Sequence, residues 1–460
     1  MEKEKKNIDR RNFLKTLGAG VAVTGGALYG FTPDIKAANT TSSSKLSGEV
    51  PTNKMTYRTN PHSGDHVSLL GYGCMRWPFR QKPGSKEEEP DQETINRLVD
   101  YAIEHGVNYF DTAPVYMRGL SEACAGIALK RHPRDKFLIA TKLSNMRDFS
   151  FEQSKEMYLQ SFKNLQVDHI DYYLLHSLGS VENCKKRFID NGMVDFLVKE
   201  RKAGRIRNLG WSFHGEVEAF DYMLAQDIQW DFAQIQLNYI DWKNADTSWN
   251  VNAEYLYDEL VKHNVPAVIM EPLLGGRLAN LPYHSLKLLK EMDINATPAE
   301  WAFRYAGTPE HVLTVLSGMV YMEHLQENIR TYSPLEPVNA EEDKVLQKIA
   351  LQMKNSDFIP CTTCQYCMPC PYGIDIPSVF SHYNKCVNDN LLPKDAQDPN
   401  YREARRAFLV GYDRQVPKLR QASHCIGCDV CRSKCPQRIN IPQEMSRIDV
   451  FTNKLRTEIY

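Results

Sequence analysis

Eight short apolar runs recur along this 460-residue chain, and each is followed by a polar turn and a segment with helical periodicity. The runs that we expect to form strands are Ser68–Cys74, Val107–Phe110, Phe137–Ala140, Asp171–Leu175, Arg207–Trp211, Phe232–Leu237, Ala267–Met270 and Val312–Leu316. Strands that are apolar along their length are typical of a parallel sheet with helices on its faces. Eight such units predict an α/β fold of the closed (β/α)8, or TIM barrel, type. The alternative is an open doubly wound sheet, but no Gly-x-Gly-x-x-Gly turn follows the first run.

The net charge and the apolar runs exclude some classes of function, and the length of the chain predicts several domains. The chain has 56 basic and 57 acidic side chains, so its formal charge is −1 and no global field attracts nucleic acid or an anionic membrane. No apolar run reaches the ~20 residues that a stable membrane span needs. We expect a signal segment over 1–38, a linker over 39–54, the barrel over 55–335 and a small, mainly helical domain over 336–460.

The amino terminus has the order of an export signal. Residues 1–15 carry six basic side chains against three acidic ones, and a glycine-rich, mildly apolar run follows over Thr16–Phe31. The stretch Asp9-Arg10-Arg11-Asn12-Phe13-Leu14-Lys15 resembles the twin-arginine signal family. The resemblance implies a folded protein that is exported to the periplasm, with the twin-arginine export machinery as a partner. A basic tail beside an apolar helix is the alternative, and the chain is cytoplasmic if the signal is not used.

Reactive side chains stand at the ends of three expected strands. Asp111, Lys142 and His176 follow the second, third and fourth runs, and Tyr116 lies five residues beyond Asp111. Alone, each has an ordinary structural explanation, such as a turn cap or a solvated charge. In a (β/α)8 barrel the carboxyl ends of the strands carry the chemistry. The four residues together therefore predict an active site.

A series of short motifs between about Ser68 and Thr331 supports this prediction. They are Phe110-Asp111-Thr112-Ala113-Pro114-Val115-Tyr116, Thr141-Lys142, Leu175-His176, Gly210-Trp211-Ser212, Gln236, Glu271-Pro272-Leu273-Leu274-Gly275-Gly276 and Glu327-Asn328. In these motifs the sequence resembles the aldo/keto reductase family, which implies a catalytic tetrad of Tyr116, Asp111, Lys142 and His176. In that resemblance Tyr116 is the general acid and base, Lys142 held by Asp111 lowers the pKa of the phenol, and His176 orients the carbonyl.

The same resemblance implies a nicotinamide cofactor, NADP or NAD. The residues expected to bind it are Ser212, Gln236, Leu273, Gly275, Glu327 and Asn328. Other positions depart from the family pattern. Phe213 stands where asparagine is usual, and Met270 where an aromatic ring usually stacks on the nicotinamide. Gly318 and His324 stand where a basic pair usually holds the 2′-phosphate of NADP, so no preference between the two nucleotides follows.

Eight of the twelve cysteines fall between positions 361 and 435, in two related motifs. The expected metal ligands are Cys361, Cys364, Cys367 and Cys370 in the first motif and Cys425, Cys428, Cys431 and Cys435 in the second. Thiolates at every third residue, closed by a Cys-Pro, bind 4Fe–4S clusters, and the last cysteine often serves the other cluster. The pattern resembles the dicluster 4Fe–4S ferredoxin family and implies two clusters. Two zinc sites or disulfides are the alternatives, and the cluster that Cys370 ligates stays open.

The surroundings of the cysteines suggest further roles. Neighbouring isoleucines are expected to shield the clusters from water; they are Ile374, Ile376, Ile426, Ile439 and Ile441. The other cysteines, Cys74, Cys124, Cys184 and Cys386, are expected to serve packing. Nine basic residues face three acidic ones between positions 400 and 440. This segment is either a solvated face, a charge balance for anionic clusters or a docking patch for an acidic redox partner.

The two resemblances together predict an exported oxidoreductase with iron–sulfur clusters. It would interconvert a carbonyl and an alcohol by hydride transfer, with a sugar-like molecule as one expected substrate and the clusters coupled to or supporting the reaction. The alternative is a non-catalytic electron-transfer or docking protein whose barrel is a scaffold. The departures at Phe213, Met270 and Gly318 favour that alternative, whereas the complete tetrad opposes it.

Overall fold

The computed structural model describes residues 49–457, except 86, 147–149, 246–250, 356, 394–396 and 436. The expected signal segment and the first part of the linker lie outside the described residues, so the twin-arginine signal stays a prediction. In the described part of the chain, no helix is both long and apolar enough to cross a membrane.

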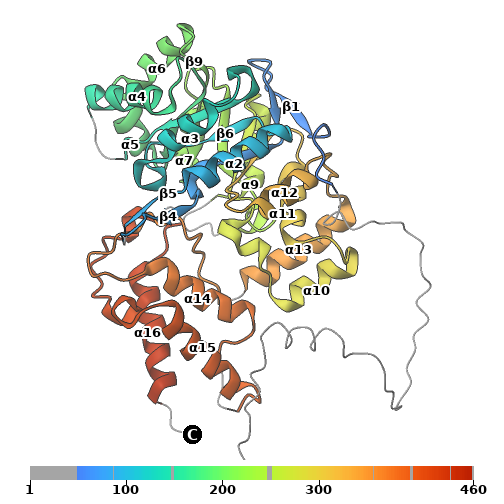
Figure 1. The fold of residues 1–460 in the computed structure, drawn as a ribbon, viewed down its shortest axis with the longest axis vertical. Helices are drawn as coiled ribbons and strands as arrows, with labels where there is room; N and C mark the ends of the chain where they lie inside the picture. Colours follow the sequence, from blue (N-terminus) through green and yellow to red (C-terminus); the bar gives the residue numbers. More distant parts are fainter. Residues whose placement is uncertain are drawn as a thin grey trace, which may run out of the picture. The chain divides into compact units, whose positions relative to one another are not determined.

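Eight parallel strands close into a barrel, as the sequence predicts (Figure 1). They are β3 (Leu70–Gly73), β6 (Tyr109–Asp111), β7 (Leu138–Leu143), β8 (Ile170–Leu178), β9 (Ile206–Phe213), β10 (Phe232–Gln236), β11 (Ala267–Met270) and β12 (Val312–Ser317). They pair in chain order, and β12 closes the ring by pairing with β3 through Val315 and Leu70. Large side chains such as Tyr109, Tyr172 and Phe232 fill the barrel interior, so the barrel is a packed core rather than a pore.

Helices cover the outside of the barrel and bury their apolar sides against the strands. They are α2 (Gln92–Glu104), α3 (Ser121–Leu129), α4 (Phe151–Leu165), α5 (Val181–Cys184), α6 (Met193–Lys202), α7 (Val217–Leu224), α8 (Asp241–Asn244), α9 (Ala253–Lys262), α10 (Tyr283–Met292), α11 (Pro298–Gly307), α12 (Met322–Thr331) and α13 (Ala340–Lys354). The structure extends the barrel beyond the expected boundary at residue 335, because Leu346 and Ile349 of α13 belong to the barrel's apolar core.

The remaining residues form a smaller helical domain with an apolar core of its own. Its helices are α14 (Ile376–Asn388), α15 (Tyr401–Gln415) and α16 (Ile441–Thr457) (Figure 1). Four of the five isoleucines expected to shield the clusters are buried in this core, whereas Ile426 is 63% exposed. Ile426 stands one residue after Cys425 in an exposed loop, which the sequence pattern does not distinguish from a buried one.

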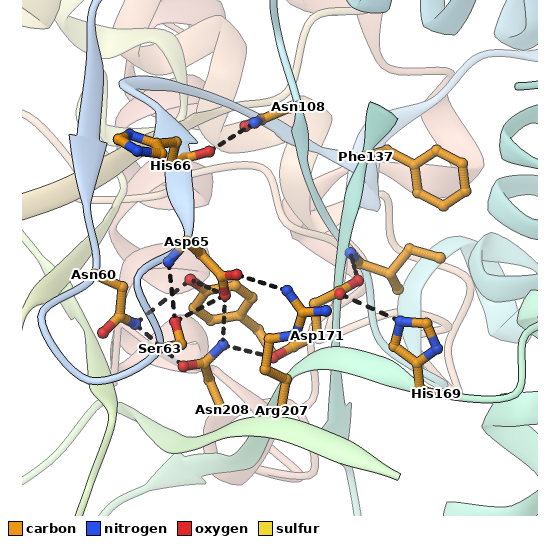
Figure 2. Close-up of polar contacts among 12 residues, drawn as sticks. Asn60, Ser63, Asp65, His66, Asn108, Phe137, His169, Asp171, Arg207 and Asn208 are labelled. Carbon is orange, nitrogen blue, oxygen red and sulfur yellow. Dashed lines mark hydrogen bonds and ion pairs between the residues drawn. The ribbon is translucent and has the colours of Figure 1, made fainter. Parts of the chain in front are cut away.

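Two short hairpins precede α2, and neither is expected from the sequence. The first, β1 (Tyr57–Thr59) with β2 (His66–Ser68), lies at the amino-terminal end of the barrel; the second pairs β4 (Phe79–Gln81) with β5 (Glu88–Pro90). Figure 2 shows Asp65, between the strands of the first hairpin, facing Arg207 and Asn208 at the start of β9. Asp65 accepts hydrogen bonds from Arg207 Nη1 at 2.7 Å and from Asn208 Nδ2 at 2.9 Å.

We expect the Asp65→Ala substitution to lower the free energy of unfolding by about 1–3 kcal/mol, because it removes an acceptor for the buried Asn208 and Tyr172 side chains. Chemical denaturation measures the change. The site predicted at the strand ends lies at the other end of the barrel, so activity per folded molecule should be unchanged. Asp168→Ala, at a side chain that is 95% exposed, is the matched control and should stay within about 0.5 kcal/mol of the parent. Equal effects of both substitutions would contradict the structural role of Asp65.

Candidate active site and cysteine centres

The four residues expected to form a tetrad lie together at the carboxyl end of the barrel. Asp111 is the last residue of β6, Lys142 lies in β7 and His176 in β8. Tyr116 starts a short turn of helix in the loop after β6. β7 and β8 are longer than expected, and the sheet holds Asp111, Lys142 and His176, whereas Tyr116 is held by a loop. All four line one cavity of about 2740 Å³.

Lys142 and Asp111 form a buried ion pair beneath this cavity. The Lys142 Nζ donates to Asp111 Oδ1 at 2.7 Å, to Asp111 Oδ2 at 2.6 Å and to the carbonyl oxygen of Thr112 at 2.9 Å. Burial lowers the pKa of Lys142 and raises that of Asp111, and each partner opposes the shift of the other. All three donor positions of the ammonium are thereby occupied. The ion pair fixes the position of Lys142 under Tyr116.

Tyr116 lies above the ion pair and beside His176. The Lys142 Nζ is 5.2 Å from the centroid of the Tyr116 ring, and the Tyr116 and His176 ring centroids are 5.9 Å apart. Tyr116 is 8% exposed, and its hydroxyl makes no hydrogen bond with any residue that the structure describes. Burial raises the pKa of Tyr116, and nearby Tyr366 and Asp111 act in the same direction. Burial therefore dominates in this arrangement and the phenol is protonated near pH 7; the lowering of its pKa by Lys142 stays a prediction.

His176 is held by one contact to its ring and one to its main chain. Its Nδ1 is 2.6 Å from Ser144 Oγ, and its carbonyl oxygen accepts from Arg187 Nη2 at 2.7 Å. Burial lowers the pKa of His176 well below its usual value, and the cations of Lys142 and Arg187 act in the same direction. The imidazole is therefore neutral near pH 7. When Ser144 donates to Nδ1, the proton of the ring lies on Nε2, where it can be donated to an oxygen in the cavity.

The lowered pKa of His176 makes stability depend on pH. Between its folded pKa and the unfolded value of about 6.5, the unfolded chain binds a proton that the folded chain does not. The free energy of unfolding is therefore undiminished above about pH 6.5, and it decreases as the pH falls below that value. We expect a parent protein denatured at pH 7.5 and pH 5 to lose more stability on acidification than His176→Asn does. The exposed His284 supplies the control His284→Asn, which should follow the parent; identical pH dependence in all three proteins would contradict the neutral assignment.

The eight expected cluster ligands fall into two groups in the structure. Cys361, Cys364 and Cys367 interact electrostatically with Cys435, the last cysteine of the second motif. Cys431 interacts in the same way with Cys425, Cys428 and Cys370. These interactions agree with an exchange of the Cys-Pro cysteines between the motifs, as in two-cluster ferredoxins, although Cys367 also interacts with Cys431. The cluster that Cys370 ligates stays open.

The eight thiols are of the donor type that iron–sulfur clusters bind. Burial raises the pKa of the Cys361 thiol to about 12 and that of Cys431 to about 11, so binding of iron must release these protons. No disulfide joins any of the twelve cysteines, all of which lie in the described part of the chain. In the described residues no three His, Cys, Asp or Glu side chains come close enough to hold one metal ion, whereas a cubane binds each thiolate on a different iron. Cys74, Cys124, Cys184 and Cys386 are buried in the apolar cores, as expected.

The residues expected to bind a nicotinamide cofactor already have partners within the chain. Ser212 Oγ accepts from the Ser177 amide at 2.8 Å, Asn328 Nδ2 donates to Ser317 Oγ at 3.0 Å, and Glu327 accepts from Thr297. Leu273 borders the cavity. Gln236 and Gly275 differ from the others because both contact the helical domain. Five of the six, all but Gln236, nevertheless line the same cavity as the tetrad.

Sequence reasoning missed several residues of the site. Arg76, in the loop after β3, and Tyr366, between two cluster cysteines, both line the cavity with Tyr116. Ser144 and Arg187 position His176. Ser144 directly follows the end of β7, two residues after Lys142, and this closeness in the sequence is the one signal that could have identified it. Nothing in the local sequence of Arg76 or Tyr366 indicates that the two domains share a cavity.

A closed barrel with an ion-paired lysine, a buried tyrosine and a neutral histidine at its carboxyl end defines an oxidoreductase-type site. The model of the aldo/keto reductase family matches residues 69–349, and that of the 4Fe-4S dicluster domain matches residues 360–440. The chain therefore belongs to the aldo/keto reductase family and carries a carboxyl-terminal iron–sulfur domain.

Individual proteins agree with the family match. The chain is 32% identical over 149 residues to probable aldo-keto reductase 1 of Glycine max, covering 29% of this chain and 41% of that protein. It is 24% identical over 318 residues to L-galactose dehydrogenase of Arabidopsis thaliana, covering 65% and 94% of the two chains. The solved aldo-keto reductase AKR11C1 from Bacillus halodurans, in its holo form, is 27% identical with a TM-score of 0.51, covering 64% and 96%.

Proposed function

We propose that this protein interconverts a carbonyl compound and the corresponding alcohol, with Tyr116 as the group that exchanges the proton. The observation that carries the proposal is the position of Tyr116, whose protonated, unpartnered phenol faces the cavity beside the neutral His176 and above the Lys142–Asp111 pair.

The proposed roles follow from these positions. In reduction, the carbonyl oxygen accepts hydrogen bonds from the Tyr116 hydroxyl and from His176 Nε2, and the phenol transfers its proton as charge develops on the oxygen. The phenolate left behind is stabilised by the Lys142 ammonium below the ring. In oxidation, the same phenolate removes the proton from the alcohol. The Ser144 hydroxyl fixes the orientation of the His176 ring through Nδ1, and Arg187 holds the main-chain carbonyl group of His176.

The helical domain is proposed to supply electron transfer. Its two cysteine groups fit two 4Fe–4S clusters, which exchange electrons one at a time when bound. Cys364 and Cys435 line the same cavity as Tyr116, so one cysteine group borders the site itself. We propose that the clusters exchange electrons between this site and a redox partner protein. The basic segment over 400–440 is the proposed docking surface for an acidic partner.

The substrate class that we propose is a polar, sugar-like molecule. The cavity is lined by charged and amide side chains around the tetrad, including Arg118, Asn183 and Glu271, which suit a polyhydroxylated compound better than an apolar one. The relative from Arabidopsis thaliana, named for dehydrogenation of L-galactose, agrees with this class.

The proposed activity is tested by a product screen on the anaerobically purified holoprotein. Sugars, polyols and their carbonyl forms are incubated with ferricyanide, reduced viologen, NADPH or NADH, and the products are identified by mass spectrometry. A product that differs from its substrate by two hydrogens supports the proposal. No turnover in either direction by a protein with intact clusters would contradict it and favour the scaffold role.

We also propose that the chain is exported to the periplasm by the twin-arginine pathway, as its arginine pair at positions 10 and 11 suggests. Assembly of clusters before export agrees with a pathway for folded proteins. Fractionation of the native host tests this point. Replacement of both arginines by lysine should retain the protein in the cytoplasm, and unchanged export would contradict the proposal.

A further inference from the structure

The loop that carries the first cysteines is pressed against a loop of the barrel. Gly275, in the turn after β11, has a φ of +67°, and a Cβ placed on it would lie 2.5 Å from both the Cα and the carbonyl oxygen of Thr362. Real Cβ atoms do not approach other atoms so closely, so the absence of a side chain at Gly275 is what lets Thr362 pack there. Thr362 is 2% exposed. The backbone of the cysteine loop therefore lies directly on the turn that was expected to bind a dinucleotide.

Arg76 continues this contact toward the loop after β12. Its Nη1 donates to Thr363 Oγ1 at 3.0 Å, and its Nη2 donates to the carbonyl oxygen of Thr362. On its other side, the Arg76 stem lies 3.4 Å from the position of a Cβ on Gly318. An unbroken series of contacts thus joins the loop after β11 to the loop after β12. It runs through Gly275, Thr362, Arg76 and Gly318.

Other contacts hold the helical domain in this position. Gln437 Nε2 donates to Gln236 Oε1 at 3.4 Å, and Asn388 Nδ2 donates to the carbonyl oxygen of Asn280 at 2.7 Å. The Arg277 guanidinium lies 4.1 Å from the centroid of the Phe358 ring. These contacts surround the turn that contains Gly275. The contact of Thr362 with Gly275 is therefore part of a broad interface.

A dinucleotide bound in the position that the family resemblance implies would have to cross this series. Such a ligand touches Ser212 and Gln236 at one end and Glu327 and Asn328 at the other, and it passes Gly275 between them. Thr362 packs on Gly275 and accepts from Arg76, and Gln437 donates to Gln236. The other expected residues border the open cavity, but a dinucleotide that also touches Gly275 and Gln236 would have to displace these contacts.

We infer that residues 360–366, here called the cysteine loop, replace the dinucleotide in this protein, so that the docked chain binds neither NAD(H) nor NADP(H) in the family's position. The departures at Met270 and Gly318 agree with this inference, because a chain without a dinucleotide needs neither an aromatic stack nor a phosphate clamp there. The carbonyl carbon then receives two electrons, supplied one at a time by a reduced redox protein through the clusters, and a proton from water, while Tyr116 supplies the proton of the new hydroxyl group.

Nucleotide binding by the full-length holoprotein tests the inference without any assay of activity. NADH and NADPH fluorescence is followed under anaerobic conditions as protein is added, with a nucleotide-dependent aldo/keto reductase as the positive control. We expect no saturable signal from this protein at nucleotide concentrations up to about 1 mM. Saturable one-to-one binding below that concentration would overturn the inference. A failed product screen would leave this result unaffected, so the two proposals fail separately.

A pair of glycine variants tests the contact itself. Gly275→Ala places a methyl group against Thr362, whereas Gly276→Ala, at a φ of +99°, places it where no atom lies within 4 Å. Hydrogen exchange over the cysteine loop should rise at least tenfold in Gly275→Ala and stay near the parent rate in Gly276→Ala. Equal exchange in the two variants would show that the loop is not packed on Gly275, and would overturn the inference.

Discussion

Replacing Lys142 with methionine is expected to lower the free energy of unfolding by about 3–5 kcal/mol, because it leaves the Asp111 carboxylate buried without its partner. Asp111 is only 2% exposed, so the destabilisation is large. Lys344→Met, at a side chain that is 70% exposed, is the matched control and should change stability by less than about 0.5 kcal/mol. Chemical denaturation of both variants beside the parent measures the difference.

The double variant Lys142→Met/Asp111→Asn separates ion pairing from simple packing. Removing both charges leaves no buried unpaired ion, so much of the stability should return. Activity should not return, because the phenolate of Tyr116 would still lack its cation. A double variant as unstable as Lys142→Met alone would contradict the ion-pair explanation.

The Tyr116→Phe substitution is expected to lower kcat by about 10²–10⁴-fold while the protein keeps its stability and its clusters. The hydroxyl has no hydrogen-bond partner among the described residues, so its removal leaves no other group unsatisfied. Since the ring remains in the cavity wall, KM should change far less than kcat. Steady-state kinetics with the substrate and electron carrier found by the product screen measures both constants.

Tyr173→Phe is the matched control for this substitution. Tyr173 is a buried tyrosine of β8 whose hydroxyl also lacks a partner, but it packs against Tyr158 outside the cavity. It should leave kcat unchanged. Equal losses in the two variants, or a Tyr116→Phe protein as active as the parent, would show that Tyr116 does not exchange the proton.

The strands and the tetrad could be predicted from the sequence because both depend on local pattern. All eight expected runs are strands of the barrel, since a strand that is buried on both faces is apolar along its length. Asp111, Lys142 and His176 come together because the carboxyl ends of parallel strands meet at one end of a barrel. The spacing of the cysteines likewise predicts a site of iron–sulfur type, and the 4Fe-4S dicluster domain matches the segment that contains all eight.

The contacts between the two domains could not be predicted in this way. Arg76 and Thr362 are 286 residues apart, and neither lies in a motif. Packing between surfaces that are distant in the sequence depends on their three-dimensional shapes, and the local periodicity of the sequence does not predict those shapes. The direction of the Tyr116 pKa shift also depends on this packing, because burial is its largest cause and Tyr366 of the helical domain acts in the same direction. The Asp65 hairpin was missed for the same reason, since its partners lie in β8 and β9.

The most direct test of the account is an anaerobic crystal structure of the holoprotein with the substrate identified by the product screen. We expect the reacting oxygen to lie about 2.6–3.2 Å from both the Tyr116 hydroxyl and His176 Nε2. We also expect the cysteine loop, residues 360–366, to remain packed on Gly275. A substrate bound away from Tyr116, or oriented with its reacting oxygen away from that hydroxyl, would contradict the account.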